Sequence, residues 1–381
     1  MGKSEISRRA LLGATASATA AVGVAATGGP ASGTGPHGSP RRPVLPIRAS
    51  QPTRTELILL GTSGGPPPDY VRTGISSVLT VGGRNYVIDA GRSSVTNYLN
   101  AGLLFSRLDS IFITHLHADH IADYYNYFLL GGNVTNDSND NLVAPVHVYG
   151  PGPAGGLPPA VQQPSPTIAP EDPTPGIKAL TEKLTEGYAY SHNIFIRETA
   201  IRDVRTLIDA HDVLPPAKVK ATFENTAPAM DPFTVMEDDR VRVTAVLVPH
   251  GPVFPSYAYR FDTDDGSVVF SGDTKASENV VKLARGADYL VHEVIDIEFY
   301  EQLGVPAPLL EHFKEGHTPT TVIGGLAERA RVKNLVLSHL VPSNPSLLSD
   351  AEYKRKCQVG FSGRVHVGND QDRLVLKKHR R

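Results

Sequence analysis

The chain has 381 residues, of which 40% are hydrophobic and 20% are charged, and its formal net charge is −2. This composition is usual for a globular protein, and the single cysteine, Cys357, excludes an internal disulfide and a cysteine-rich metal site. Residues 1–50 carry six Lys or Arg and one Asp or Glu, so the rest of the chain holds 31 basic and 38 acidic residues, a net charge of −7. This acidic body, residues 51–381, argues against electrostatic binding of nucleic acid.

The first residues predict an export signal. Ser7-Arg8-Arg9 precedes a weakly apolar stretch, rich in Ala, Thr and Gly, that continues to Ala26. Adjacent arginines before such a stretch are typical of the twin-arginine route. We predict a signal peptide over residues 1–26, a disordered tether over 27–54 and a periplasmic or extracellular location. The apolar stretch is short and contains Ala and Gly rather than Leu, so we expect no stable membrane span.

In the remaining residues, 55–381, we predict a single domain in which short apolar strands form hairpins first and then alternate with helices. Strands are expected over 57–60, 77–81, 86–89, 108–114, 146–149, 241–248, 257–261, 268–270, 289–291 and 335–337. Helices are expected over 94–101, 122–130, 177–188, 277–285 and 318–331. This pattern predicts the α/β class, as a sandwich of two sheets with helices outside.

One part of this domain is expected to be irregular. Residues 151–175 hold nine prolines, which predicts a segment without regular structure. The segment begins a Pro-rich insertion at about 151–216, which we expect to lie over the functional cleft and to shape substrate choice.

Four ligand-type side chains follow the strand predicted over 108–114: His115, His117, Asp119 and His120. In an extended segment, His115 and His117 point the same way, and the other two follow where the chain turns into a helix. Four such side chains within six residues can surround two adjacent cations. Imidazole and carboxylate suit zinc first, with manganese or iron as alternatives.

Three further candidate ligands stand just after apolar strands. His250 follows residues 246–249, Asp273 follows 268–272, and His339 follows 335–338. Polar side chains at the points where buried strands emerge are well placed to meet at one edge of a layered fold. We therefore expect these three residues to complete the site that the four-residue cluster begins.

The His-x-His-x-Asp-His run resembles the signature of the metallo-β-lactamase superfamily, and further motifs resemble its ribonuclease Z and arylsulfatase-like branch. The matching motifs are Leu60-Gly61-Thr62, Tyr149-Gly150-Pro151, His250 with Tyr257-Ala258-Tyr259-Arg260, Ser271-Gly272-Asp273-Thr274, His292-Glu293, Gly316-His317-Thr318 and Ser338-His339. The resemblance covers about residue 56 to the C-terminus. It implies the metallo-β-lactamase fold, a four-layer αββα sandwich of two mixed sheets.

The resemblance also implies how two zinc ions would be held. One metal is implied at His115, His117 and His250, and the other at Asp119, His120 and His339, with Asp273 bridging them. In classical β-lactamases of this fold the position of Asp273 is usually Cys or Ser. The aspartate here therefore argues against a β-lactam substrate.

Catalytic roles follow from the same resemblance. Asp119 is expected to orient a metal-bridging hydroxide while it ligates, and His317 to protonate the leaving group. His292 and Glu293 are expected to orient His317 by hydrogen bonding.

Our first hypothesis is an exported dinuclear-zinc hydrolase that cleaves a sulfate ester or a phosphodiester in a small molecule. The alternatives are a ribonuclease Z-like tRNA 3′-processing endonuclease, a lactonase and a non-catalytic zinc-binding exoprotein. Export and the acidic body argue against the ribonuclease. Two further features argue against it. The run Asp89-Ala90-Gly91-Arg92 replaces the acidic Asp-Cys-Gly-Glu typical of those enzymes, and the chain lacks a Lys/Arg-rich, Gly-rich arm. We therefore expect no nucleic-acid partner, and we leave a homodimer open.

Overall fold

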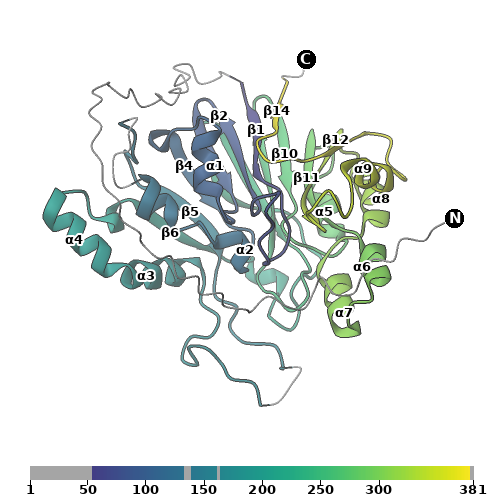
Figure 1. Ribbon diagram of the computed structural model, residues 1–381, viewed down its shortest axis with the longest axis horizontal. Coiled ribbons are helices and arrows are strands. Elements are labelled where there is room, and N and C mark those ends of the chain that lie inside the picture. The colour runs from purple at the N-terminus through teal and green to yellow at the C-terminus, as the bar shows by residue number, and fades with distance from the viewer. Residues whose placement is uncertain (1–53, 133–138, 161–163, 378–381) are drawn as a thin grey trace, which may run out of the picture. The chain divides into compact units, whose positions relative to one another are not determined.

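The computed structural model describes residues 54–132, 139–160 and 164–377 (Figure 1). The predicted signal peptide lies outside the described residues, as does the tether up to residue 53. Within the described part of the chain, no helix has both the length and the apolar character that crossing a membrane requires.

The first of two seven-stranded sheets has the order β14-β1-β2-β3-β4-β5-β6. Its strands are β1 (Glu56–Gly61), β2 (Ser76–Val81), β3 (Arg84–Ile88), β4 (Leu108–Phe112), β5 (Val146–Pro151), β6 (Ile208–Val213) and β14 (Arg373–Val375). The β14-β1-β2-β3 part is antiparallel and the β3-β4-β5-β6 part is parallel. The sheet is therefore mixed.

The second sheet has the order β13-β12-β11-β10-β9-β8-β7. Its strands are β7 (Phe233–Glu237), β8 (Val241–Leu247), β9 (Tyr257–Thr263), β10 (Gly266–Phe270), β11 (Tyr289–Ile295), β12 (Asn334–Val341) and β13 (Arg364–Val367). Strands β7 to β10 pair antiparallel, and β10 to β13 pair parallel. This sheet is mixed in the same way.

Helices cover the outer face of each sheet (Figure 1). Beside the first sheet lie α1 (Ser94–Asn100), α2 (Ala118–Ile121), a π-helical turn (Tyr127–Gly132), α3 (Ile177–Gly187) and α4 (Ala189–Thr199). Beside the second lie α5 (Glu278–Leu283), α6 (Ile297–Leu303), α7 (Ala307–Gly316), α8 (Thr320–Ala330) and α9 (Asp350–Cys357). Short 3-10 turns occur at Phe105–Arg107, Val204–Thr206 and Ala217–Val219. The four-layer αββα sandwich is confirmed.

Two hydrophobic cores hold these layers together. One fills the space between the sheets and continues to the helices beside the second sheet. It includes Leu57, Leu79 and Phe112 of the first sheet, Val243, Phe261 and Val291 of the second, and Val280, Ile323 and Leu326 of α5 and α8. The other lies between the first sheet and its helices and includes Ile58, Val78, Val148, Tyr98, Tyr124 and Ile177. Neighbouring residues of β1, such as Leu57 and Ile58, enter different cores because side chains alternate along a strand. Both faces of this strand are buried, which explains its unbroken apolar run.

Most of the expected elements form, and the differences have local causes. The helix predicted over 122–130 does not form as one continuous helix. Helix α2 ends at Ile121, and the chain resumes as the π-helical turn over Tyr127–Gly132. Gly131 in that turn lies so close to the Phe105 ring that an added Cβ would clash with it. Helix α8 begins at Thr320 rather than at Thr318, whose hydroxyl donates to the backbone oxygen of Thr274 instead of capping the helix.

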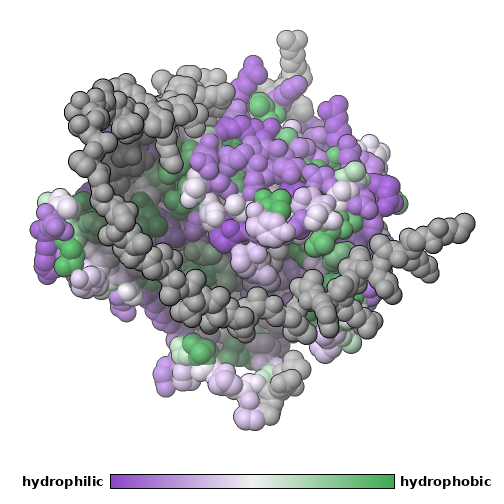
Figure 2. Space-filling model, in the orientation of Figure 1, coloured by the Kyte–Doolittle hydropathy of each residue, from purple (hydrophilic) through white to green (hydrophobic). Residues whose placement is uncertain are grey.

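The Pro-rich insertion is more regular than its proline content predicts. No helix or strand occupies the described residues between Pro151 and Ile177, but α3, α4 and the edge strand β6 follow them. Figure 1 shows this proline-rich segment projecting downward from the lower ends of the strands, on the side of α2. In Figure 2 hydrophilic residues dominate the upper right of the visible face, and the hydrophobic residues are scattered spots.

Candidate metal centre

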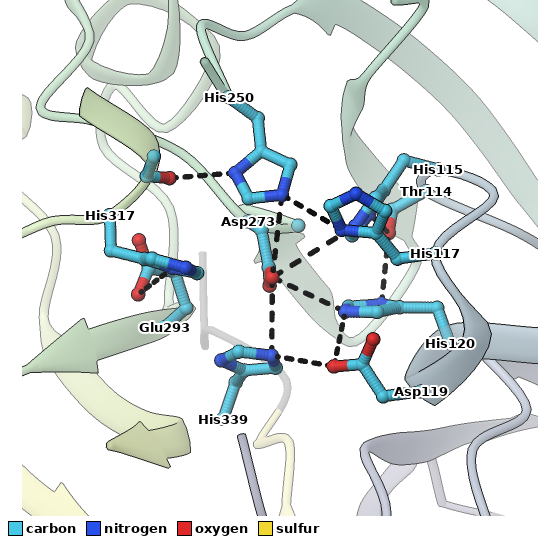
Figure 3. Close-up of polar contacts among 12 residues, drawn as sticks. Thr114, His115, His117, Asp119, His120, His250, Asp273, Glu293, His317 and His339 are labelled. Carbon is cyan, nitrogen blue, oxygen red and sulfur yellow. Dashed lines mark hydrogen bonds and ion pairs between the residues drawn. The ribbon is translucent and has the colours of Figure 1, made fainter. Parts of the chain in front are cut away.

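The carboxyl ends of four strands meet at one edge of the sandwich, and the predicted ligands stand there (Figure 3). After β4 the chain stays extended to His117 and then enters α2, which places His115 and His120 side by side with ring centroids 4.0 Å apart. His250 follows β8, and Asp273 follows β10. A backbone hydrogen bond from Tyr257 N to Thr114 O, 3.0 Å long, joins the two sheets at this edge.

The sequence predicts that His339 follows its strand. In the structure His339 lies inside β12. Its backbone has a φ of 46°, which is uncommon for a residue other than glycine. This local kink brings its ring 5.2 Å from that of His120, centroid to centroid.

The seven predicted ligands form two adjoining groups of buried or half-buried side chains. One group consists of His115, His117 and His250, and the other of Asp119, His120, Asp273 and His339; within each, the ligand atoms lie within 4.8 Å of one another. The structure therefore gathers all seven in the two sets that the resemblance implies. The one difference concerns Asp273. The resemblance implies that it bridges the two metals, whereas the distances group it with Asp119, His120 and His339.

Asp273 lies between the two groups (Figure 3). Its Oδ2 is 3.1 Å from His339 Nε2 and 3.4 Å from His120 Nε2 in its own group. The same oxygen is 3.9 Å from the Nε2 atoms of His115 and His250 in the other group. A single carboxylate thus faces both sets of imidazoles, as a bridging ligand must.

The donor atoms fit divalent cations. His115 Nε2, His120 Nε2, Asp119 Oδ1 and Asp273 Oδ1 are buried and make no hydrogen bond among the described residues. A buried polar atom without a partner costs about 1–3 kcal/mol, and more if it is charged. Cations that accept the lone pairs of these four atoms would explain why the atoms are buried without hydrogen-bond partners.

The protonation states agree with this assignment. Burial lowers the pKa of His115 well below its ordinary value and that of His250 to about 3, so both imidazoles are neutral and keep a lone pair. Burial alone would raise the pKa of Asp119, but His120 and His339 outweigh it and lower the pKa to about 2. His115 and His250 are therefore neutral imidazoles beside an ionised carboxylate, the forms that bind metals. Burial lowers the pKa of His120, but Asp273, Asp89 and Asp119 outweigh it and raise the pKa well above its ordinary value, so a metal would have to displace the proton of this ring.

Other residues orient these ligands. His120 Nδ1 donates to Asp89 Oδ2 over 2.9 Å, which leaves Nε2 to face the centre. Asp89 also accepts a hydrogen bond from Thr114 N at 2.8 Å, and its own φ is 56°. His250 Nδ1 donates to Gly316 O at 2.8 Å. The orienting role of Asp89 was not predicted from the sequence, although this residue directly follows β3 and so had the same strand-end signal as the ligands.

His317 and Glu293 form a buried pair at the side of the metal centre (Figure 3). Their Nδ1 and Oε2 atoms are 3.4 Å apart, and Glu293 Oε1 accepts a 2.7 Å hydrogen bond from Thr318 N. Burial lowers the pKa of His317, but the Glu293 carboxylate outweighs it and raises the pKa to about 9. His317 therefore carries a proton next to the centre.

His292 lies elsewhere. Its Nδ1 donates to the backbone oxygen of Glu293 at 2.7 Å, and its Nε2 makes no hydrogen bond among the described residues. The structure thus places Glu293 against His317, whereas the described contacts of His292 are with the backbone of its own strand.

The fold and this centre define a metal-dependent hydrolase of the metallo-β-lactamase fold. The model of the metallo-β-lactamase superfamily matches residues 70–129. A ribonuclease Z of Mycobacterium bovis is 31% identical over 327 residues, which span 85% of this chain and 99% of that protein. The ribonuclease Z of Mycobacterium tuberculosis is 30% identical over the same shares. The chain belongs to the ribonuclease Z family.

Solved structures share the fold. The short form of human tRNase Z superposes with a TM-score of 0.56 at 19% identity, over 84% of this chain and 99% of that one. Zinc-bound PqqB from Methylobacterium extorquens superposes with a TM-score of 0.52 at 13% identity, over the same shares. These likenesses support the fold alone.

Proposed function

We propose that the protein is a two-zinc phosphodiesterase of the ribonuclease Z type. The observation that carries the proposal is the Asp273 carboxylate. Its Oδ2 faces both groups of imidazoles, and its Oδ1 has no hydrogen-bond partner in the part of the chain that the structure describes. Bound divalent cations supply Lewis acidity, lower the pKa of water and neutralise charge on a phosphoryl group. The chain would hold them with the two ligand groups described above.

Two side chains would do the remaining work. Asp119 would orient attacking water while it ligates. Its Oδ1 has no hydrogen-bond partner among the described residues and a carboxylate oxygen has lone pairs for both a cation and a water, while Oδ2 faces His339 at 3.3 Å. His317 can protonate the leaving oxygen, because Glu293 keeps it charged and holds the adjoining backbone in place. The family relationship supports RNA as the first substrate to test, since the relatives are named for it.

The second candidate is hydrolysis of a sulfate ester in a small molecule, one of the two bonds named in our first hypothesis. Its support is the net charge of −7 outside residues 1–50 and the lack of a basic, Gly-rich arm. Arg92, which replaces the family's acidic residue, supports it further. Its guanidinium donates to the backbone oxygens of Asp69 and Arg72, so it fastens the neighbouring loop instead.

One hydrolysis panel separates these candidates. The zinc-loaded protein is assayed on pre-tRNA, bis-nitrophenyl phosphate, an aryl sulfate and a lactone. We expect cleavage of both phosphodiesters, and loss of it on chelation or in Asp273→Ala. His366→Ala, at a half-buried histidine of β13 that pairs with Asp372, is the matched control. Cleavage of the aryl sulfate alone would move the assignment to the second candidate, and full activity of metal-stripped Asp273→Ala would overturn the metal centre itself.

A further inference from the structure

A second cluster of metal-binding side chains lies on β5 and β6, outside the centre described above. The two strands are parallel neighbours, with His147 paired to Asp209 and Tyr149 paired to His211. His147, Asp209 and His211 place their ligand atoms within 4.8 Å of one another. We infer that these three residues form a separate divalent-metal site, with zinc as the preferred ion.

The carboxylate lies between the two imidazoles. Asp209 Oδ2 is 2.9 Å from His147 Nδ1 and 3.0 Å from His211 Nε2. Although the second distance is short, His211 Nε2 is buried and makes no hydrogen bond among the described residues. A ring nitrogen that is close to a carboxylate but bonded to nothing is suitably placed to share a cation with it.

Aromatic packing fixes the imidazole of His211. Its ring stacks on Tyr149 with centroids 5.0 Å apart and planes 17° apart. Tyr149 in turn stacks on Phe112, at 5.1 Å and 19°, and so connects the site to the core between the sheets. The ring is thereby oriented before any ion binds, which lowers the entropy cost of binding.

Two imidazoles and one carboxylate are a common three-residue ligand set for zinc, and a solvent molecule usually completes the tetrahedron. The side chains of His147, Asp209 and His211 are 46%, 47% and 42% exposed, so a fourth ligand can reach the ion from solvent. The site therefore suits an exchangeable ion rather than a buried one.

This site is distinct from the main centre. Tyr149 of β5 pairs with Phe112 of β4, so the cluster is level with residues 110–112 and lies three to five residues before His115. At about 3.3 Å per residue, roughly 10–16 Å of strand separate the two.

An ion here would stabilise the edge of the first sheet. Strand β6 is the last strand, and the segment that carries α3 and α4 connects it to β5. An ion held by both strands would close that connection of about 60 residues, and cross-links that close long loops stabilise most. We therefore assign the site a structural role at this edge.

The test compares metal content and zinc affinity in the full chain without a polyhistidine tag. The variants are His211→Gln and Asp209→Asn, which keep the size of each side chain. The control is His366→Gln, because His366 also lies 2.8 Å from a carboxylate, that of Asp372, and is 39% exposed, but it has only this one partner.

We expect His211→Gln and Asp209→Asn each to bind one zinc ion fewer than the wild type, or to bind that ion at least tenfold more weakly. Hydrolytic activity and the remaining ions should be unchanged, and the control should match the wild type. Protease cleavage between β5 and β6 should become faster when zinc is removed from the wild type but not from the two variants. Equal metal content and equal zinc affinity in His211→Gln and the control would overturn the inference, as would loss of the ions of the main centre in both site variants.

Discussion

Asp89 is not among the candidate ligands, but it holds one of them, His120, in position. Its carboxylate accepts hydrogen bonds from His120 Nδ1 and from Thr114 N and Oγ1, so it fixes both the tautomer and the direction of the His120 ring. Partners of this kind contribute 10- to 100-fold to metal affinity in other proteins.

We therefore expect Asp89→Asn, which keeps the size of the side chain and removes its charge, to weaken zinc binding by about 10- to 100-fold. Competition with a chromophoric chelator measures the change. The control is Asp231→Asn, at an exposed aspartate that pairs only with Lys282 among the described ion pairs. An unchanged zinc affinity in Asp89→Asn would show that the charge of Asp89 is not needed to hold the His120 ring in its orientation.

His317 leads to a prediction about leaving groups. A general acid accelerates a reaction by about 100- to 10,000-fold when the leaving oxygen needs a proton, and much less when it does not. We expect His317→Ala to lower kcat strongly for an alkyl phosphodiester and weakly for a nitrophenyl phosphodiester. His312→Ala, at an exposed histidine of the neighbouring helix α7, is the control. Equal losses of kcat for the two substrates would contradict the assignment of His317 as the general acid.

At this scale the structure brings the seven predicted ligand residues together, whereas the support from Asp89 was not predicted. Ligands such as His250 and Asp273 follow apolar strands, and the parallel strands of this fold bring their carboxyl ends to one edge. The role of Asp89 was not predicted, because it depends on the side chain of His120, 31 residues away, and local pattern contains no trace of such a pair. The role of Glu293 beside His317 was expected only from the family resemblance, since the two lie 24 residues apart. The cluster of His147 and His211 was missed for the same reason, since each histidine is unremarkable alone.

Among the elements, the turn after β10 sets the position of Asp273. Gly272 in this turn has a φ of +58°, and an added Cβ would lie 2.7 Å from Tyr257 O and 3.0 Å from Thr114 Cβ. The close approach of this turn to Thr114 brings Asp273 up against the cluster that follows β4. A glycine is therefore required here both for its backbone conformation and for space.

We expect Gly272→Ala to lower the free energy of unfolding by about 2–3 kcal/mol and to weaken zinc binding, because the turn must move away from β9. Gly286→Ala is a matched control, since Gly286 has a φ of +67° but no atom within 4 Å of an added Cβ. It should cost about 1 kcal/mol, the strain of the left-handed backbone alone. Urea denaturation and zinc titration measure both effects, and equal results for the two variants would refute the steric argument.

The elements that the sequence failed to predict are those with weak burial patterns. Strand β6 lies at a sheet edge, and five of its six residues are only half-buried, so it shows neither an apolar run nor a clear alternation. Helix α4 is also largely exposed, with Tyr190 at 85% and Ile194 at 45%. The hairpin of β2 and β3 was predictable because Gly82 and Gly83, with φ values of 55° and 78°, permit the turn between two apolar strands.

For the molecule as a whole, the location of the protein decides which substrate it can meet. The acidic body, the lack of a basic arm and the twin-arginine pattern at Arg8-Arg9 favour a substrate outside the cytoplasm, whereas the family relationship favours RNA. A protein exported in its folded form can already contain its metals, so export and a two-zinc centre are compatible. The location therefore separates the two candidate functions independently of any assay of hydrolysis.

We propose export by the twin-arginine route, and we expect replacement of Arg8 and Arg9 by lysine to retain the protein in the cytoplasm. Cell fractionation and immunoblotting of the full chain, expressed in a bacterium with a working twin-arginine system, measure the distribution. A fusion of residues 1–54 to a reporter that is active only after folded export tests whether the segment suffices. Replacement of Arg41 and Arg42, an arginine pair with no apolar stretch after it, is the control and should leave export intact. Equal export of the Arg8/Arg9 variant and the wild type would refute the twin-arginine route. Retention of the wild type in the cytoplasm would remove the compartment argument against RNA and leave the hydrolysis panel to decide the substrate alone.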